Sequence, residues 1–158
     1  MNFVHLTPAE IMMAATIGIM RQATNIRDDR KDRYGASEKN GWQLHVEGAL
    51  GEAAVAKGLN IFWNGSIGTF KAPDVADLQV RSTTWSSGSL IIHKADSSKE
   101  IFILVTGVNG SYVLRGWMYG ADAKNEKYWK DPKKENRFAY FVPQSDLEPM
   151  SKLKKLVK

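Results

Sequence analysis

Cysteine is absent from this chain of 158 residues. Its absence excludes a disulfide framework, a thiolate metal site and a cysteine nucleophile. A chain of this length can bury roughly two-thirds of the surface that it exposes when unfolded, so a hydrophobic core can stabilise it without cross-links. We therefore expect one domain spanning residues 1–158, and the lack of cysteine is typical of a reducing cytoplasm.

Long apolar runs and a secretory signal are also missing from the sequence. No stretch reaches the ~18 uncharged apolar residues that a membrane span needs. The amino terminus lacks a basic segment followed by an apolar core and a small-residue cleavage site. We therefore expect an unprocessed cytoplasmic protein with no membrane partner.

Several catalytic signatures are lacking as well. The sequence has no glycine-rich phosphate-binding loop ending in Lys-Ser/Thr, no dinucleotide-binding fingerprint and no nucleophile elbow. Its three histidines, His5, His45 and His93, show no zinc-ligand spacing, so zinc is not expected.

Positive charge is present in modest excess and is unevenly distributed. Lysine and arginine number 22 against 17 aspartates and glutamates, which gives a formal net charge of +5. One basic group lies in residues 21–33 and another in residues 152–158. Such groups favour phosphate-rich partners, although solvated surface charge is the alternative interpretation.

Two helices are predicted in the first third of the chain. Thr7 is a capping residue, Pro8 suits the first helical position, and Glu10 is placed to reach back to the cap. These signals predict a helix over 7–23, followed by a basic loop over 24–41. Good helix formers then predict a second helix from Trp42 to Lys57, with Gly58 as its stop.

After residue 58 the apolar pattern changes to a period of two, which predicts strands. Asn109-Gly110 is typical of a two-residue hairpin turn. The expected fold class is α+β, with a central mixed but mostly antiparallel sheet flanked by helices. The predicted strands are 59–63, a short piece at 68–70, 78–84, 90–94, 101–106, 112–118 and 138–142.

A polar row is predicted along the strand that begins after Asp77. Alternation places Leu78 and Val80 on one face, and Asp77, Gln79 and Arg81 on the other. Acid, amide and cation side chains in a row on a sheet are typical of hydrolytic metal sites, in which carboxylates hold Mg²⁺ and a cation binds the phosphate. An ordinary solvent-facing surface is the alternative.

These residues resemble a known family. A helix with Glu52, then Pro73-Asp74, then Gln79-x-Arg81 is similar to the PD-(D/E)XK nuclease superfamily, whose restriction-endonuclease-like fold has an αβββαβ core. The resemblance covers residues 42–147. The wider pattern also resembles uncharacterised bacteriophage and bacterial proteins; it comprises segments 48–52, 74–75, 80–83, 90–93, 102–107 and 139–144.

The resemblance implies a role for each motif residue. Asp74 would be the principal ligand of Mg²⁺ or Mn²⁺, with Glu52 as an auxiliary ligand. Gln79 would bind the metal through its side-chain oxygen, and Arg81 would occupy the position of the family's catalytic lysine. The implied function is hydrolysis of DNA phosphodiester bonds.

The sequence departs from the family pattern at three points. Glutamine replaces the second acid, which lowers the negative charge available to a divalent ion. Arginine replaces lysine, and a guanidinium group cannot act as a base. The short interval between Asp74 and Gln79 requires a sharp turn at Ala76-Asp77 or a bulge, so Asp77 is an alternative metal ligand.

DNA is the expected partner, and six residues are candidates for binding it. A catalytically inactive nuclease-fold protein that binds nucleic acid, or a bacteriophage accessory protein, is the alternative function. The helix at 7–23 could then bind a protein partner or a second copy in a homodimer. If a bacteriophage encodes the chain, the expected compartment is the cytoplasm of the bacterial host. The candidates for binding DNA are Arg30, Lys31, Arg33, Trp85, His93 and Lys94.

Overall fold

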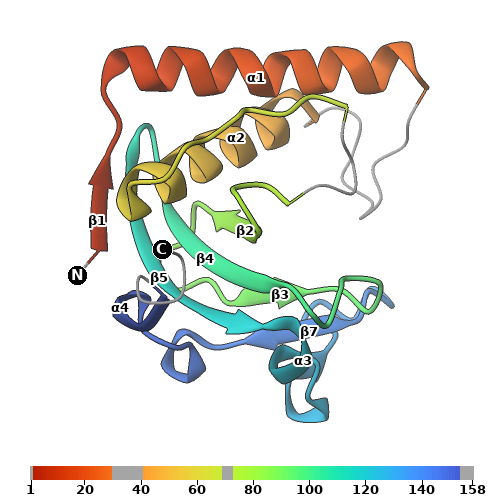
Figure 1. The fold of residues 1–158 in the computed structure, drawn as a ribbon. Coiled ribbons are helices and arrows are strands. Elements are labelled where there is room, and N and C mark those ends of the chain that lie inside the picture. Colours follow the sequence, from red (N-terminus) through yellow and green to blue (C-terminus); the bar gives the residue numbers. More distant parts are fainter. Residues whose placement is uncertain (1, 30–40, 69–72, 154–158) are drawn as a thin grey trace.

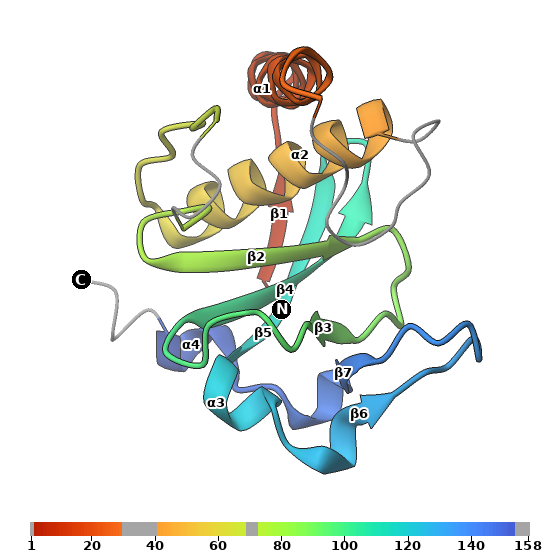
Figure 2. The same ribbon diagram turned by 90° about the vertical axis from the view of Figure 1, so that its right-hand side faces the viewer.

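Two helices, a four-stranded sheet and a three-stranded sheet form successive layers (Figures 1 and 2). The structure is a computed structural model that describes residues 2–29, 41–68 and 73–153. Helices and strands with a mixed sheet confirm the predicted α+β class. The elements are β1 Asn2–His5, α1 Pro8–Arg27, α2 Gly41–Leu59, β2 Leu78–Thr83, β3 Leu90–Ile92, β4 Ile101–Val108, β5 Ser111–Tyr119, α3 Gly120–Ala123, η2 Glu126–Tyr128, β6 Trp129–Lys130, β7 Ala139–Val142, η3 Gln144–Asp146 and α4 Met150–Leu153.

Helix α1 begins as its capping residues predict. The Thr7 side chain accepts a hydrogen bond from the Glu10 amide, and the Glu10 carboxylate accepts one from the Thr7 amide at 2.6 Å. The helix continues to Arg27, four residues beyond the predicted end at 23. The predicted basic loop over 24–41 is therefore wrong at its start, while residues 30–40 lie outside the described part.

Helix α2 ends at Leu59, two residues later than predicted, in a left-handed cap. Asn60 has a φ of 57°, its amide donates to the Lys57 carbonyl, and the Ile61 amide donates to the Ala56 carbonyl. This is the hydrogen-bond pattern of a Schellman motif. The strand predicted at 59–63 is wrong. Residue 59 ends α2, residue 60 is its cap, and residues 61–63 do not form a strand. Of the piece predicted at 68–70, only Gly68 is described.

The larger sheet has the strand order β1-β5-β4-β2. Strands β4 and β5 form the predicted hairpin, with φ of 52° at Asn109 and 84° at Gly110. Strand β1, which the sequence pattern did not predict, pairs antiparallel with β5, while β2 pairs parallel with β4. The smaller sheet, β3-β7-β6, is antiparallel throughout, so most pairings are antiparallel as expected.

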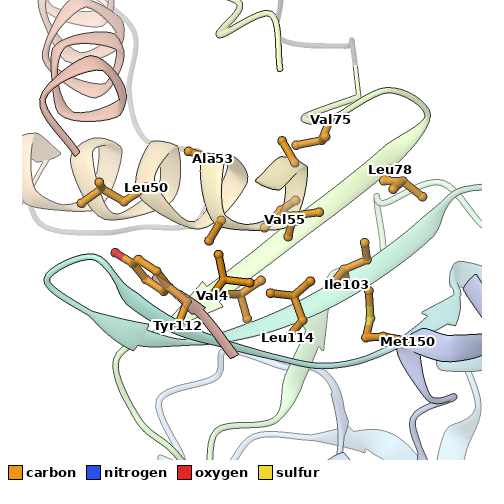
Figure 3. Close-up of a cluster of buried hydrophobic side chains, with 14 of the residues drawn as sticks. Val4, Leu50, Ala53, Val55, Val75, Leu78, Ile103, Tyr112, Leu114 and Met150 are labelled. Atoms are coloured by element: carbon orange, nitrogen blue, oxygen red, sulfur yellow. The ribbon is translucent and has the colours of Figure 1, made fainter. Parts of the chain in front are cut away.

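The layers enclose two hydrophobic clusters. The first lies between α2 and the larger sheet and includes Leu50, Val55, Leu78 and Ile103 (Figure 3). The second lies between the two sheets and is built around Phe102, which is fully buried. Each cluster stabilises the fold by roughly 25 cal/mol per Å² of apolar surface removed from water. The larger sheet thus has a hydrophobic cluster on each of its two faces, and β2 is one of its edge strands.

The αβββαβ core that the family resemblance implies stays a prediction. Helix α2 precedes the strands as that pattern requires, but β3 pairs in the smaller sheet. The helix after β5, Gly120–Ala123, has four residues. In the described part of the chain, no helix is both long and apolar enough to cross a membrane.

Candidate active site

A tight turn carries Asp74 back along the edge strand β2. The amide of Leu78 donates to the Val75 carbonyl at 2.9 Å, and Ala76 has a φ of 50°. The turn expected at Ala76-Asp77 is therefore present. It brings Asp74 beside Val80, whose amide donates to Asp74 Oδ2 at 2.7 Å. None of the described strands pairs with β2 on this side, so the Asp74 carboxylate accepts a hydrogen bond from an amide that would otherwise face outward.

Glu52 lies on α2 and is only 5% exposed. Arg21 of α1 donates from both terminal nitrogens to its two carboxylate oxygens, at 2.6 and 2.9 Å. Trp63 Nε1 donates to Glu52 Oε2 at 3.0 Å, and Arg21 Nε donates to the Ser66 carbonyl at 2.9 Å. A forked arginine with a third donor compensates a buried carboxylate well. Sequence reasoning placed neither Arg21 nor Trp63 in the site.

Four charged side chains influence one another around Asp74. The pKa of Asp74 is raised to about 6, mainly by burial and also by the negative charge of Glu52. The Val80 amide and the charges of Arg81 and Arg21 oppose this shift. The pKa of Arg21 is itself raised: burial lowers it, but the hydrogen bonds and charge of Glu52 outweigh that effect. Asp74 is thus a partly buried acid, and the nearby amide and arginines only partly offset the cost of ionising its carboxyl.

The two other motif residues lie on the opposite face of β2 from its core residues. Leu78 and Val80 contribute to the cluster under α2, as strand alternation predicts. Gln79 Nε2 donates to Glu100 Oε1 at 3.3 Å. Arg81 donates to Asp96 Oδ2 at 3.1 Å, and its guanidinium carbon lies 5.0 Å from the centre of the Phe102 ring. The Gln79 amide is therefore engaged with an acid that the sequence analysis did not consider.

The alternative ligand, Asp77, is exposed in the turn between Val75 and Leu78. It precedes the first residue of β2, so it is not part of the strand's polar row. The carboxylate that the turn directs against β2 is that of Asp74.

Several basic residues lie near Asp96, and with it they form what we call the Asp96 cluster: Arg81, His93, Asp96, Lys124 and Arg137. The His93 amide donates to Asp96 Oδ2 at 2.8 Å. Lys124 Nζ donates to the backbone carbonyls of Lys94, at 3.1 Å, and of Asp96. Burial lowers the pKa of His93; Asp96 opposes this shift, whereas Arg81 and Arg137 add to it. Positive groups outnumber the one carboxylate, so the cluster suits a phosphate.

The remaining predicted DNA-binding residues fall into two groups. Trp85 is 74% exposed in the turn after β2, and Lys94 is exposed beside the Asp96 cluster. Arg30, Lys31 and Arg33 lie outside the described residues. The structure therefore brings Arg81 and His93 together. Trp85 follows the last residue of β2, whereas the Asp74 turn precedes the first residue of that strand.

Asp74 and Glu52 are the two carboxylates of this site that could hold a divalent ion. Mg²⁺ prefers oxygen ligands and is commonly held by one or two carboxylates, with water and substrate phosphate completing its shell. Asp74 and Glu52 meet that minimum, although Arg21 and Trp63 already engage Glu52. Among the described residues, no group of three or more acids or histidines is arranged to hold a metal. A divalent ion bound by these two carboxylates would therefore take most of its ligands from water or a substrate phosphate.

A hollow of about 600 Å³ lies elsewhere, against β5 and the chain after β7. Its lining includes Trp117, Tyr119, Asp146 and Glu148, none of which the sequence analysis placed in a site.

No protein-family model, curated protein or solved structure matches this chain.

Proposed function

We propose that the chain is a nuclease that hydrolyses DNA phosphodiester bonds with Mg²⁺ or Mn²⁺. The main support for the proposal is the charged environment of the Asp74 carboxyl and its raised pKa. Its carboxyl lies close enough to Glu52, Arg21 and Arg81 for their charges to affect its pKa, which is raised to about 6. A divalent cation next to Asp74 would relieve the repulsion between the two carboxylates and favour the ionised form.

Each residue would contribute a distinct function. Asp74 would be the principal ligand, and Arg21 would hold Glu52 in place as the second acid. Arg81 would bind the phosphate through its planar guanidinium, in competition with Asp96. The divalent ion would stabilise charge on the phosphate oxygens and activate the attacking water. Arginine side chains do not act as bases, so Arg81 is assigned phosphate binding only.

A second function, nucleic-acid binding without cleavage, is supported by a different observation. Glu52 already receives three hydrogen bonds, and Arg81 is already paired with Asp96. Such pairing is also expected in a nuclease fold that has lost its metal. The excess of cations around Asp96 would then serve only to bind phosphate groups.

The deciding experiment is DNA cleavage with and without Mg²⁺, using the full chain and Asp74→Asn. This substitution removes the charge while keeping the shape and an oxygen that can accept from the Val80 amide. We expect at least a 100-fold loss of cleavage, as is typical when a group acting on the transition state is removed. Folding is checked by circular dichroism.

The matched control is Asp122→Asn, which removes the same charge from an exposed position on α3. It should cleave like the unmodified chain. Equal activity of Asp74→Asn and the unmodified chain would refute the assignment. DNA binding that persists in EDTA, weakens steeply with salt and gives no cleavage with either ion would favour the binding function.

A further inference from the structure

Helix α1 exposes an uncharged apolar face on the outside of the molecule. It forms the outermost layer, with α2 between it and the sheets (Figures 1 and 2). Exposed patches of this kind on a soluble protein mark interaction surfaces when they exceed a few hundred Å². The five large side chains of this face are Met12 (69% exposed), Met13 (67%), Ile19 (47%), Met20 (47%) and Ile26 (58%).

The exposed residues of α1 follow a seven-residue repeat. A small residue, Ala9, Thr16 or Ala23, recurs every seven positions, and each is exposed. Large residues follow three positions after each small one, at Met12, Ile19 and Ile26. The Thr16 hydroxyl donates to the Met12 carbonyl at 2.8 Å, so it adds little polarity to the face. Apolar positions repeating every seven residues are typical of a seam between two helices.

This face is complementary to itself when two copies run antiparallel. If the two-fold axis crosses the helix between positions 17 and 18, each small residue of one copy lies opposite a large residue of the other. The three opposed pairs are Ala9 with Ile26, Met12 with Ala23, and Thr16 with Ile19. Alternating small and large residues across a seam allows the side chains to interdigitate. A parallel arrangement would place small against small and leave gaps.

The charges on α1 also favour a second copy over a lipid surface. Glu10 pairs with Lys57 at 2.7 Å, and Arg21 pairs with Glu52 on the inner side of the helix. Between these two residues the helix carries no charge. Helices that lie on membranes usually carry many basic residues and aromatic anchors beside their apolar face, and residues 11–20 contain neither.

We propose that two copies of this chain associate through the outer faces of their α1 helices, packed antiparallel about a two-fold axis. The contact is isologous, so each copy contributes the same surface. A helix of 20 residues is about 30 Å long, which gives an interface at the small end of the range for specific complexes. The dimer therefore dissociates on dilution. The inference does not depend on the proposed nuclease activity.

Sedimentation velocity of the full chain between about 1 and about 200 µM tests the proposal, since small interfaces give affinities in this range. The unmodified chain should shift from one-chain to two-chain mass as its concentration rises. Ile19→Lys, which introduces a charge beside the axis, should remain monomeric throughout. The matched control is Phe138→Lys: Phe138 is 49% exposed, against 47% for Ile19, and precedes β7 on the far side of the sheets (Figure 1).

Two results would overturn the proposal. One is an unmodified chain that stays monomeric at every concentration, whether or not it partitions onto neutral lipid vesicles in a parallel flotation assay. The other is an Ile19→Lys variant that dimerises as well as the Phe138→Lys control. Ile19 is exposed, so its substitution should leave the fold intact, as circular dichroism can verify.

Oxidative cross-linking then determines the orientation, because the chain has no cysteine of its own. A mixture of Met12→Cys and Ala23→Cys chains should form a covalent dimer containing one copy of each. Met12→Cys alone should not, because its two copies would lie about 16 Å apart along the antiparallel pair, beyond the reach of a disulfide. Efficient cross-linking of Met12→Cys to itself would contradict the antiparallel arrangement.

Discussion

Two ion pairs on opposite sides of β2 differ in how completely their charges are balanced. Arg21 and Glu52 meet through two hydrogen bonds, with side chains 18% and 7% exposed. Arg81 and Asp96 meet through one bond of 3.1 Å, with side chains 25% and 10% exposed. The first pair has an additional acid beside it, Asp74, whereas additional cations lie near the second.

The difference shows how one strand can separate two kinds of binding chemistry. Under the proposed function, the paired acids Asp74 and Glu52 would hold a divalent cation on one side of β2, and the basic groups around Asp96 would bind a phosphate on the other. Arg81 affects the pKa of both Asp74 and His93, so it connects the two regions. Substitutions that affect one of these regions more than the other test whether the two ion pairs differ in charge balance.

The largest expected effect comes from breaking the forked pair. Arg21→Met leaves the Glu52 carboxylate buried without its main partner, which should lower the free energy of unfolding by about 3–5 kcal/mol. Arg81→Met removes a single hydrogen bond from a more exposed pair and should cost about 1–2 kcal/mol. Urea denaturation at neutral pH measures both. Equal losses would mean that the two pairs do not differ as described.

A smaller effect is expected from pH. The folded-state pKa of Asp74 is about 6, above the usual 3.8, so the folded chain binds this proton more tightly than the unfolded chain does. This contribution to stability is present below about pH 4 and is lost as the pH rises towards 6, which should cost about 2–3 kcal/mol.

Asp74→Asn removes this ionisation, so it should be more stable than the unmodified chain at pH 8 and similar to it at pH 4. Denaturation at both pH values measures the difference. Adding Mg²⁺ at pH 8 should stabilise the unmodified chain and not Asp74→Asn, because binding to the folded state raises stability by mass action. An Mg²⁺ effect of equal size in both would place the ion elsewhere.

The smallest effect on stability is expected at Trp85. Because its side chain is 74% exposed, Trp85→Ala should change the free energy of unfolding by no more than about 0.5 kcal/mol. If bases stack on this ring, the same substitution should weaken single-stranded DNA binding by about 1–3 kcal/mol. Fluorescence anisotropy measures the affinity. Phe3→Ala, a 59% exposed aromatic on the opposite edge strand β1, is the control and should bind normally.

Signals contained in a few neighbouring residues predicted the local structure well. Thr7, Pro8 and Glu10 specified the start of α1, and Asn109-Gly110 specified the β4–β5 hairpin. Strand β1 escaped prediction because its four residues form a strand only by pairing with β5, more than 100 residues later.

The candidate site was predictable only in part. Asp74, Glu52 and Arg81 were identified as motif residues. The short interval from Asp74 to Gln79 predicted either a sharp turn at Ala76-Asp77 or a bulge, and the structure has the turn. Their partners were not identified, because Arg21 precedes Glu52 by 31 residues and Asp96 follows Arg81 by 15. No local pattern relates residues so far apart in the chain.

Local sequence signals were enough to predict the α+β class, the capped helix, the hairpin and the alternation along β2, because each depends on backbone preferences and on a period of apolar residues within one element. Tertiary structure decided which charges face one another. Packing α1 on α2 delivers Arg21 to Glu52, and the turn after Pro73 delivers Asp74 to the edge of β2. Charge balance at a buried group depends on distances between elements, and only the folded chain sets those distances.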